Sequence, residues 1–136
     1  MDFLKSMAIA ASGLRAQAGR MRIISENIAN ADSTPSRPGA NPYRRKLPTF
    51  GSDFDRALDA RTVSLGRVRT DSSDFRLKYE PGHPAADGNG NVKYPNVNPL
   101  IEMTDMREAQ RSYEANVNVI GATRRMIQRT LDILKA

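Results

Sequence analysis

Residues 2–31 read DFLKSMAIAASGLRAQAGRMRIISENIANA and set the fold of the N-terminal part of the chain. Apolar or small side chains recur there at alternating steps of three and four, at Leu4, Met7, Ala11, Leu14, Ala18, Met21, Ser25 and Ile28. A heptad pattern sustained in this way predicts one long helix with an apolar seam. Asp32-Ser33-Thr34-Pro35 follows, and the residue before a proline disfavours helical geometry, so we expect the helix to end there.

A second pattern of the same kind occupies residues 99–136. Asn98 is a favourable N-cap, and Pro99 suits the first helical position because its missing N–H is not needed there. One heptad seam runs along this segment through Met103, Met106, Tyr113, Val117, Ile120, Ile127, Leu131 and Leu134. The two seams predict long terminal helices that pair as a coiled coil, within one chain, between chains, or both.

The stretch between the helices differs in composition, because seven of the eight prolines and six of the nine glycines lie in residues 32–98. Phe75, Leu77 and Tyr79 alternate with polar residues, which predicts a half-buried strand. Residues 63–68 predict a second strand, with Gly66 as a possible bulge. The sequence therefore predicts a mainly α fold with a small β-rich insert, in three segments: 1–31, 32–98 and 99–136.

Composition removes several classes of protein. The 136 residues include no cysteine, which excludes a disulfide framework and a cysteine zinc site. No segment has the run of about 18 apolar residues that spans a bilayer, so we expect no stable membrane insertion. The net charge of +6 permits nucleic acid or an acidic partner. Its basic residues are spread over all three segments and form no single stripe, so we expect no nucleic-acid partner.

Catalytic and metal-binding arrangements find little support. His83 is the single histidine, and with Asp87 alone it does not make a metal site. Nothing in its Pro/Gly-rich surroundings would orient it for nucleophilic catalysis. Asp53, Asp55 and Asp59 lack the spacing of a calcium-binding EF-hand loop. We expect a protein that is not an enzyme and uses no cofactor.

The end of the first helix, Glu26-Asn27-Ile28-Ala29-Asn30-Ala31-Asp32-Ser33, resembles the N-terminal motif of flagellar rod, hook and filament proteins. Further similarity lies in Pro42-Tyr43-Arg44-Arg45-Lys46 and in the stretches 79–84, 92–98, 102–106 and 111–117. These internal motifs make the chain similar to the C-type family of proximal rod proteins of the bacterial flagellar basal body.

The resemblance implies a structural subunit of the basal-body rod, which assembles helically and transmits torque from motor to hook. It implies an inner tube made of terminal helices and a middle segment placed further out. The implied partners are copies of this chain, other rod proteins, the rod-to-base adaptor protein and the flagellar type III export apparatus. The implied location is the periplasmic rod, reached without cleavage of a signal peptide.

We predict that the subunit interface is formed by seam residues together with polar residues of the motifs. Asn27 and Asn30 are expected to hydrogen-bond to neighbouring subunits and fix their register, as a buried Asn does in coiled coils. For Arg44, Arg45 and Lys46 we expect ion pairs with acidic faces of adjacent subunits. The full predicted set is Leu4, Met7, Leu14, Met21, Asn27, Ile28, Asn30, Tyr43, Arg44, Arg45, Met103, Met106, Tyr113, Asn116, Val117, Ile120, Ile127, Leu131 and Leu134.

Overall fold

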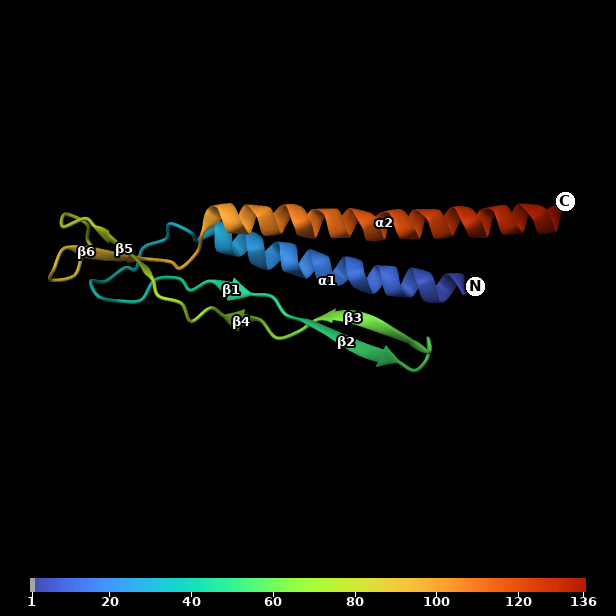
Figure 1. The fold of residues 1–136 in the computed structure, drawn as a ribbon, viewed down its shortest axis with the longest axis horizontal. Coiled ribbons are helices and arrows are strands. Elements are labelled where there is room, and N and C mark those ends of the chain that lie inside the picture. The colour runs from blue at the N-terminus through green and yellow to red at the C-terminus, as the bar shows by residue number, and fades with distance from the viewer. Residues whose placement is uncertain (1) are drawn as a thin grey trace. The chain divides into compact units, whose positions relative to one another are not determined.

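The computed structural model describes residues 2–136. Along the chain, one long helix comes first, six short strands follow, and a second long helix comes last (Figure 1). The elements are α1 (Phe3–Ala29), β1 (Lys46–Leu47), β2 (Phe50–Asp55), β3 (Ala60–Leu65), β4 (Arg69–Thr70), β5 (Arg76–Tyr79), β6 (Asn91–Tyr94) and α2 (Pro99–Lys135). The predicted fold class, two long terminal helices around a middle of short strands and loops, is confirmed.

The helix ends follow from local capping. Asp2 Oδ1 accepts the N–H of Lys5 at 3.1 Å and caps the start of α1. Asn98 does the same for α2, where its Oδ1 accepts the N–H of Leu100 at 3.1 Å. At the other end of α1, the carbonyl of Glu26 accepts both the Asn30 N–H at 3.1 Å and the Asn30 side-chain amide at 2.9 Å. Both helices therefore begin and end within two residues of the predicted bounds.

Each strand pairs with one partner only, in three two-stranded antiparallel sheets: β1 with β4, β2 with β3, and β5 with β6. Two strand predictions are corrected in detail. β3 ends at Leu65, and the Gly66 N–H donates to Thr49 O at 2.7 Å in the unbroken register, so Gly66 is not a bulge. β5 lies where predicted, but its side chains are exposed and not half-buried.

The chain forms two compact units, and each contains part of both helices. Unit 1 consists of Met1–Met21, Thr49–Arg67 and Arg107–Ala136, and unit 2 consists of Arg22–Pro48 and Val68–Met106. The units cut across the three predicted segments, because each helix contributes one stretch to each unit.

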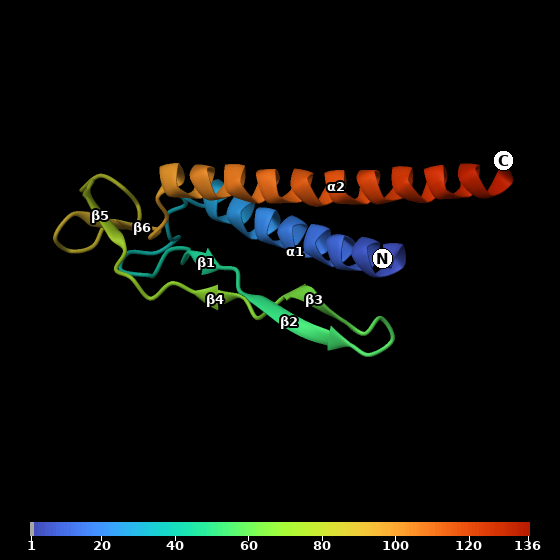
Figure 2. The same cartoon turned by 45° about the vertical axis from the view of Figure 1, so that its right-hand side comes forward.

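Unit 1 has a core of small residues. Within it α1 and α2 lie side by side, and the β2–β3 hairpin follows α1 (Figures 1 and 2). A Cβ added to Gly13 of α1 would come within 2.8 Å of the Asn116 amide of α2, so the helices approach closely there. The ion pair between Arg20 and Glu108 fixes their antiparallel order. The buried residues of this unit are Ala10, Ser12, Ala16, Ala60, Ala109 and Thr123.

Unit 2 buries larger side chains. Ile23 and Ile24 of α1 pack in a core with Val92 of β6 and Val97 of the loop before α2. Asn27 and Glu102 are buried in the same unit. Because a buried isoleucine or valine removes far more apolar surface from water than a buried alanine, we infer that unit 2 contributes most of the hydrophobic stability of the chain.

The predicted heptad seams coincide only in part with the faces that are turned inward. Leu4 of α1 and Met103, Val117 and Leu134 of α2 are exposed. The face of α2 turned toward the rest of the chain runs through Glu102, Met106, Ala109, Tyr113, Asn116, Ile120, Thr123 and Ile127. Half of the predicted α2 seam lies on this face, together with small or polar residues such as Ala109, Asn116 and Thr123. The other half, Met103, Val117, Leu131 and Leu134, is in solvent.

Candidate assembly surface

Asn27 is the centre of a polar network in unit 2. Its amide nitrogen donates to Lys46 O at 2.8 Å and to Glu102 Oε2 at 3.1 Å. Its Oδ1 accepts the Lys46 N–H at 2.9 Å and the Tyr43 hydroxyl at 2.7 Å. The side chain is 0% exposed. One amide thus joins the end of α1, the strand β1 and the start of α2.

Arg45 forms an ion pair with the buried carboxylate of Glu102. Its Nε donates to Glu102 Oε1, and its other nitrogens lie 3.6 Å from Asp71 Oδ2 and from Asp105 Oδ2. Burial alone would lower the pKa of Arg45, but the hydrogen bond and charge of Glu102 outweigh it and raise the pKa. The Asn96 side chain holds the Arg45 backbone, since its Oδ1 accepts the Arg45 N–H at 2.8 Å.

Within the chain, Asn27 and the basic run have partners that the interface prediction did not include. Asn27 uses its amide within the chain and has no exposed surface, so the hydrogen bonds expected to neighbouring subunits are replaced by intrachain ones. The basic run also finds its partners within the chain. Arg45 pairs with Glu102, Lys46 pairs with Glu26, and the Arg44 guanidinium lies 4.2 Å from the centre of the Phe75 ring. The residues therefore stabilise the fold of unit 2.

Tyr43 gives this network a measurable pH dependence. Burial, followed by the charges of Glu26 and Glu102, raises the pKa of Tyr43 from its ordinary 10.0 to about 12. A raised pKa means that the neutral phenol is favoured in the folded state. Its contribution to stability is therefore complete below pH 10 and is lost as the pH rises through about 12.

We predict that Tyr43→Phe lowers the free energy of unfolding by about 1 kcal/mol at neutral pH, because Asn27 Oδ1 loses a donor. Between pH 10 and 12 the wild type should lose this advantage, so that the two unfolding free energies converge. Urea titrations at several pH values measure the difference, and subtraction removes the common effect of lysine titration. A difference that stays constant up to pH 12 would contradict the assignment.

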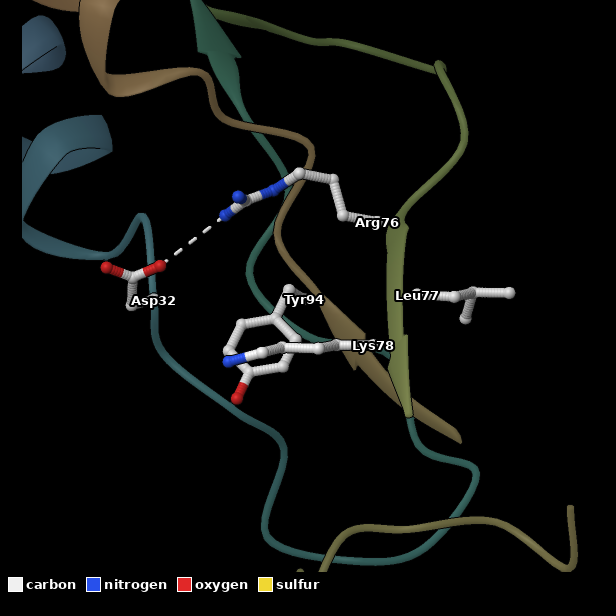
Figure 3. A pocket seen from close by; sticks show the side chains of 5 residues that line it. All are labelled: Asp32, Arg76, Leu77, Lys78 and Tyr94. Carbon is white, nitrogen blue, oxygen red and sulfur yellow. Dashed lines mark ion pairs between the residues drawn. The ribbon is translucent and has the colours of Figure 1, made fainter. Parts of the chain in front are cut away.

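A hollow of about 310 Å³ lies beside the β5–β6 sheet, lined by Asp32, Arg76, Leu77, Lys78 and Tyr94. In Figure 3 Arg76, Lys78 and Tyr94 gather on the side of Asp32, and Leu77 points the other way. The Arg76 guanidinium is already held by Asp32 at 3.5 Å and by the carbonyl of Ala31 at 2.8 Å. Lys78 pairs with Glu80 at 2.8 Å. Both cations of the hollow are therefore paired with carboxylates of the same unit.

His83 and Asp87, considered above as metal ligands, instead accept backbone hydrogen bonds within their loop. The His83 Nδ1 accepts the N–H of Ala85 at 3.0 Å, and Asp87 Oδ1 accepts the N–H groups of Asn89 and Asn91. Among residues 2–136 no group of three His, Cys, Asp or Glu side chains could hold a metal ion. No helix in the same range is long and apolar enough to cross a membrane.

The predicted interface residues fall into three groups. Asn27 is buried. Thirteen are half-buried: Met7, Leu14, Met21, Ile28, Asn30, Tyr43, Arg44, Arg45, Met106, Tyr113, Asn116, Ile120 and Ile127. Five are exposed: Leu4, Met103, Val117, Leu131 and Leu134. The structure joins Asn27, Tyr43 and Arg45 in one network, and the exposed group lies along both helices. Contacts of these residues with other subunits stay a prediction.

Unit 1 exposes the apolar surface expected of an assembly subunit. Exposed in it are Leu4, Ile9, Phe50, Phe54, Val63, Val117, Val119, Met126, Leu131, Ile133 and Leu134. Its buried residues are all threonine-sized or smaller. Exposed apolar side chains in this number and over several elements mark a surface for binding other proteins.

Sequence reasoning missed the acidic half of the network. Glu102, Asp71 and Asn96 were assigned no role in the sequence analysis. One signal was available, since Glu102 lies four residues before Met106 and seven before Ala109, on the stripe that α2 turns inward. An acidic residue on such a stripe calls for a buried cation, and the basic run at 44–46 could have supplied it.

Two family models match this chain. The model described as flagella basal body rod protein matches residues 7–35, and the one described as flagellar basal body rod FlgEFG protein C-terminal matches residues 89–133. A flagellar basal-body rod protein FlgC of Agrobacterium fabrum is 57% identical, over 100% of this chain and 99% of its own length. Those of Bacillus subtilis and Salmonella typhimurium are 37% and 38% identical, each over at least 98% of both chains.

Proposed function

The chain belongs to the FlgC family of flagellar basal-body rod proteins and is a structural subunit of the flagellar rod, and from this premise we propose how it assembles. Copies of the chain pack with one another and with other rod proteins through the exposed apolar side chains of unit 1. Contacts of this heterologous kind, which do not close into a ring, build an open helix. A rod built in this way carries torque from the motor to the hook without any catalytic step.

The observation that supports this proposal most is the contrast between the two units. Unit 2 has the larger apolar core, with buried isoleucines, valines and a satisfied polar network, although it also exposes residues such as Leu77 and Leu100. Unit 1 buries only small residues and leaves large apolar side chains of α1, α2 and the hairpin in solvent. When an exposed leucine or phenylalanine side chain becomes fully buried in an assembly, the burial contributes about 1.5–3 kcal/mol to its stability.

The partners and the place of assembly are also part of the proposal. We infer contacts with the rod-to-base adaptor protein at one end of the rod, and export through the flagellar type III apparatus into the periplasm without cleavage of a leader. Nucleic-acid binding has less support, because the basic residues are spread over all three segments of the sequence and form no single stripe.

The experiment is a deletion of the gene followed by purification of basal bodies. We expect rods to be absent or shortened and the cells to be non-motile, with both restored by the wild-type gene. Intact rods in cells that lack the chain would overturn the proposed function.

A double variant tests the surface itself. Leu131→Gln with Leu134→Gln should leave the unfolding free energy of the purified chain within about 0.5 kcal/mol, because both side chains are exposed. Rod assembly and motility should nevertheless be lost, since the apolar contact is gone. The matched control is Arg125→Gln with Arg129→Gln on the same helix, which are also exposed and should assemble. Normal motility of the leucine variant would contradict the proposal.

A further inference from the structure

Strand β2 has an open edge. The Val63 N–H of β3 donates to Ser12 Oγ of α1 at 3.1 Å, so it points away from β2 and toward the helix. The Gly66 N–H donates to Thr49 O, which marks that pair as a hydrogen-bonded one in the same register. Since bonded and non-bonded pairs alternate in an antiparallel ladder, Phe50, Ser52 and Phe54 turn their backbone groups outward.

The second strand with an open edge is β5. The Glu80 N–H donates to Gly90 O at 2.9 Å, in the register that pairs Tyr79 with Asn91 and Leu77 with Lys93. By the same alternation, Leu77 and Tyr79 turn their backbone N–H and C=O groups outward. Within residues 2–136, β2 and β5 each pair with one strand only, and they belong to different sheets.

Both open edges carry large exposed apolar side chains at the outward positions. Phe50 is 46% exposed and Phe54 is 55% exposed on β2. Leu77 is 63% exposed and Tyr79 is 71% exposed on β5, and Leu77 points away from the lined hollow in Figure 3. An exposed edge of this kind is a template for pairing with a strand of another chain.

The charges of the two strands are opposite. Strand β2 carries Asp53 and Asp55, and strand β5 carries Arg76 and Lys78. Two β2 edges together would bring four carboxylates into one sheet, whereas β2 with β5 is neutral. Opposite charges directly across a strand pair stabilise it, and like charges destabilise it.

We propose that β2 of one copy of the chain pairs antiparallel with β5 of the next copy, which rests on the proposed function as a rod subunit. One register places the outward-facing backbone groups opposite each other and also pairs the opposite charges. Phe54 lies opposite Leu77 and Ser52 opposite Tyr79, as hydrogen-bonded pairs between the outward-facing groups. Asp53 then lies opposite Lys78, and Asp55 opposite Arg76.

This contact is heterologous, because each copy offers β2 to one neighbour and β5 to another. A symmetric β2–β2 contact would close into a dimer, whereas a series of β2–β5 contacts can continue from copy to copy. Arg76 and Lys78 also keep their ion pairs with Asp32 and Glu80, and their side chains stay exposed enough to meet a second carboxylate.

The absence of cysteine from the chain allows a clean cross-linking test. In cells lacking the natural gene, Ser52→Cys and Tyr79→Cys variants are co-expressed and basal bodies are purified after mild oxidation. Paired residues in a ladder have Cα atoms about 5.5 Å apart, within the range of a disulfide. We expect a cross-linked dimer only when both variants are present. The matched control, Ser64→Cys on β3 with Tyr79→Cys, should give only background.

A charge exchange checks the register without relying on cysteine. Asp53→Lys should reduce motility and rod yield several-fold, and Lys78→Asp should do the same, because each places like charges opposite one another. The double variant should recover most of the loss. This exchange also decides the matter if Tyr79→Cys fails to assemble.

The outcomes separate the inference from the function. Basal bodies that contain the chain, without the Ser52–Tyr79 cross-link and without recovery by the charge exchange, would overturn the β2–β5 contact and leave the rod function standing. A cross-link from Ser52→Cys to itself would assign a symmetric β2 pair, and a cross-link to a different rod protein would assign another occupant; either overturns the proposal. Basal bodies that lack the chain would instead overturn the proposed function.

Discussion

Arg45→Met should lower the free energy of unfolding of the chain by about 3–5 kcal/mol, the usual cost of leaving one member of a buried ion pair without its partner. The Glu102 side chain is only 1% exposed, and Arg45 is the cation that contacts it. Without the guanidinium, the carboxylate keeps one neutral donor, the Asn27 amide at 3.1 Å. Methionine fills a similar length of space, so the loss reports charge and not a cavity.

Urea unfolding followed by circular dichroism of the purified chain gives the measurement. Arg69→Met is the matched control, because Arg69 is an exposed arginine of β4 in the same unit and forms no ion pair in the described chain. It should change the unfolding free energy by no more than about 0.5 kcal/mol.

The double variant Arg45→Met with Glu102→Leu separates a buried charge from a general packing defect. Once both charges are gone, the start of α2 holds an apolar side chain in a buried position, and replacing a whole buried ion pair is often neutral or stabilising. We expect the double variant to recover much of the lost stability. A double variant no more stable than the single one would show that Arg45 acts through packing alone.

Local features of the sequence were sufficient to locate the helices. The cap at Asn98 and the proline at position 35 act on neighbouring residues, so their effect could be predicted from the sequence alone. Strands β3 and β5 were located for the same reason, through short apolar alternation. Strand β2 was missed because its sequence FGSDFD contains a glycine and two aspartates, which seldom favour a strand without a partner.

The faces of the helices could not be chosen in the same way. A heptad search gives weight to large apolar residues. It selected Met106, Tyr113, Ile120 and Ile127, which lie on the inward face of α2, but also Leu4, Met103 and Leu134, which are exposed. It could not select Gly13, where α1 approaches Asn116 of α2 closely because there is no side chain. Small residues are a weak signal in a sequence, because alanine and glycine are also common on helix surfaces. The exposed large residues stay predicted contacts with other subunits.

The pairings in the polar network could not be predicted because they join distant parts of the sequence. Asn27 bonds to Lys46 across 19 residues and to Glu102 across 75. One sequence shows which residues have the right chemistry but not which of them meet. Asn27 was recognised as important from the family motif, and its partners were sought in other subunits when they lie in the same chain.

Asn27→Asp should be the most damaging isosteric change in the chain, with a loss of about 5 kcal/mol. The amide nitrogen now donates to Lys46 O and Glu102 Oε2, and a carboxylate oxygen in its place would face two acceptors at 2.8 and 3.1 Å. It would also put a second negative charge beside Glu102 in a site without solvent. Asn27→Ala removes the hydrogen bonds without adding a charge, so its loss should be smaller, about 3 kcal/mol.

The control for this change is Asn118→Asp, the same substitution at an exposed position of α2, with an expected effect within about 0.5 kcal/mol. Measuring the purified monomer is what decides the role of Asn27. An amide that fixes the register between subunits would alter rod assembly and leave the monomer's unfolding free energy unchanged. An amide that joins α1, β1 and α2 within one chain must lower it before any assembly takes place. A monomer of Asn27→Asp as stable as the wild type would return the residue to the subunit interface.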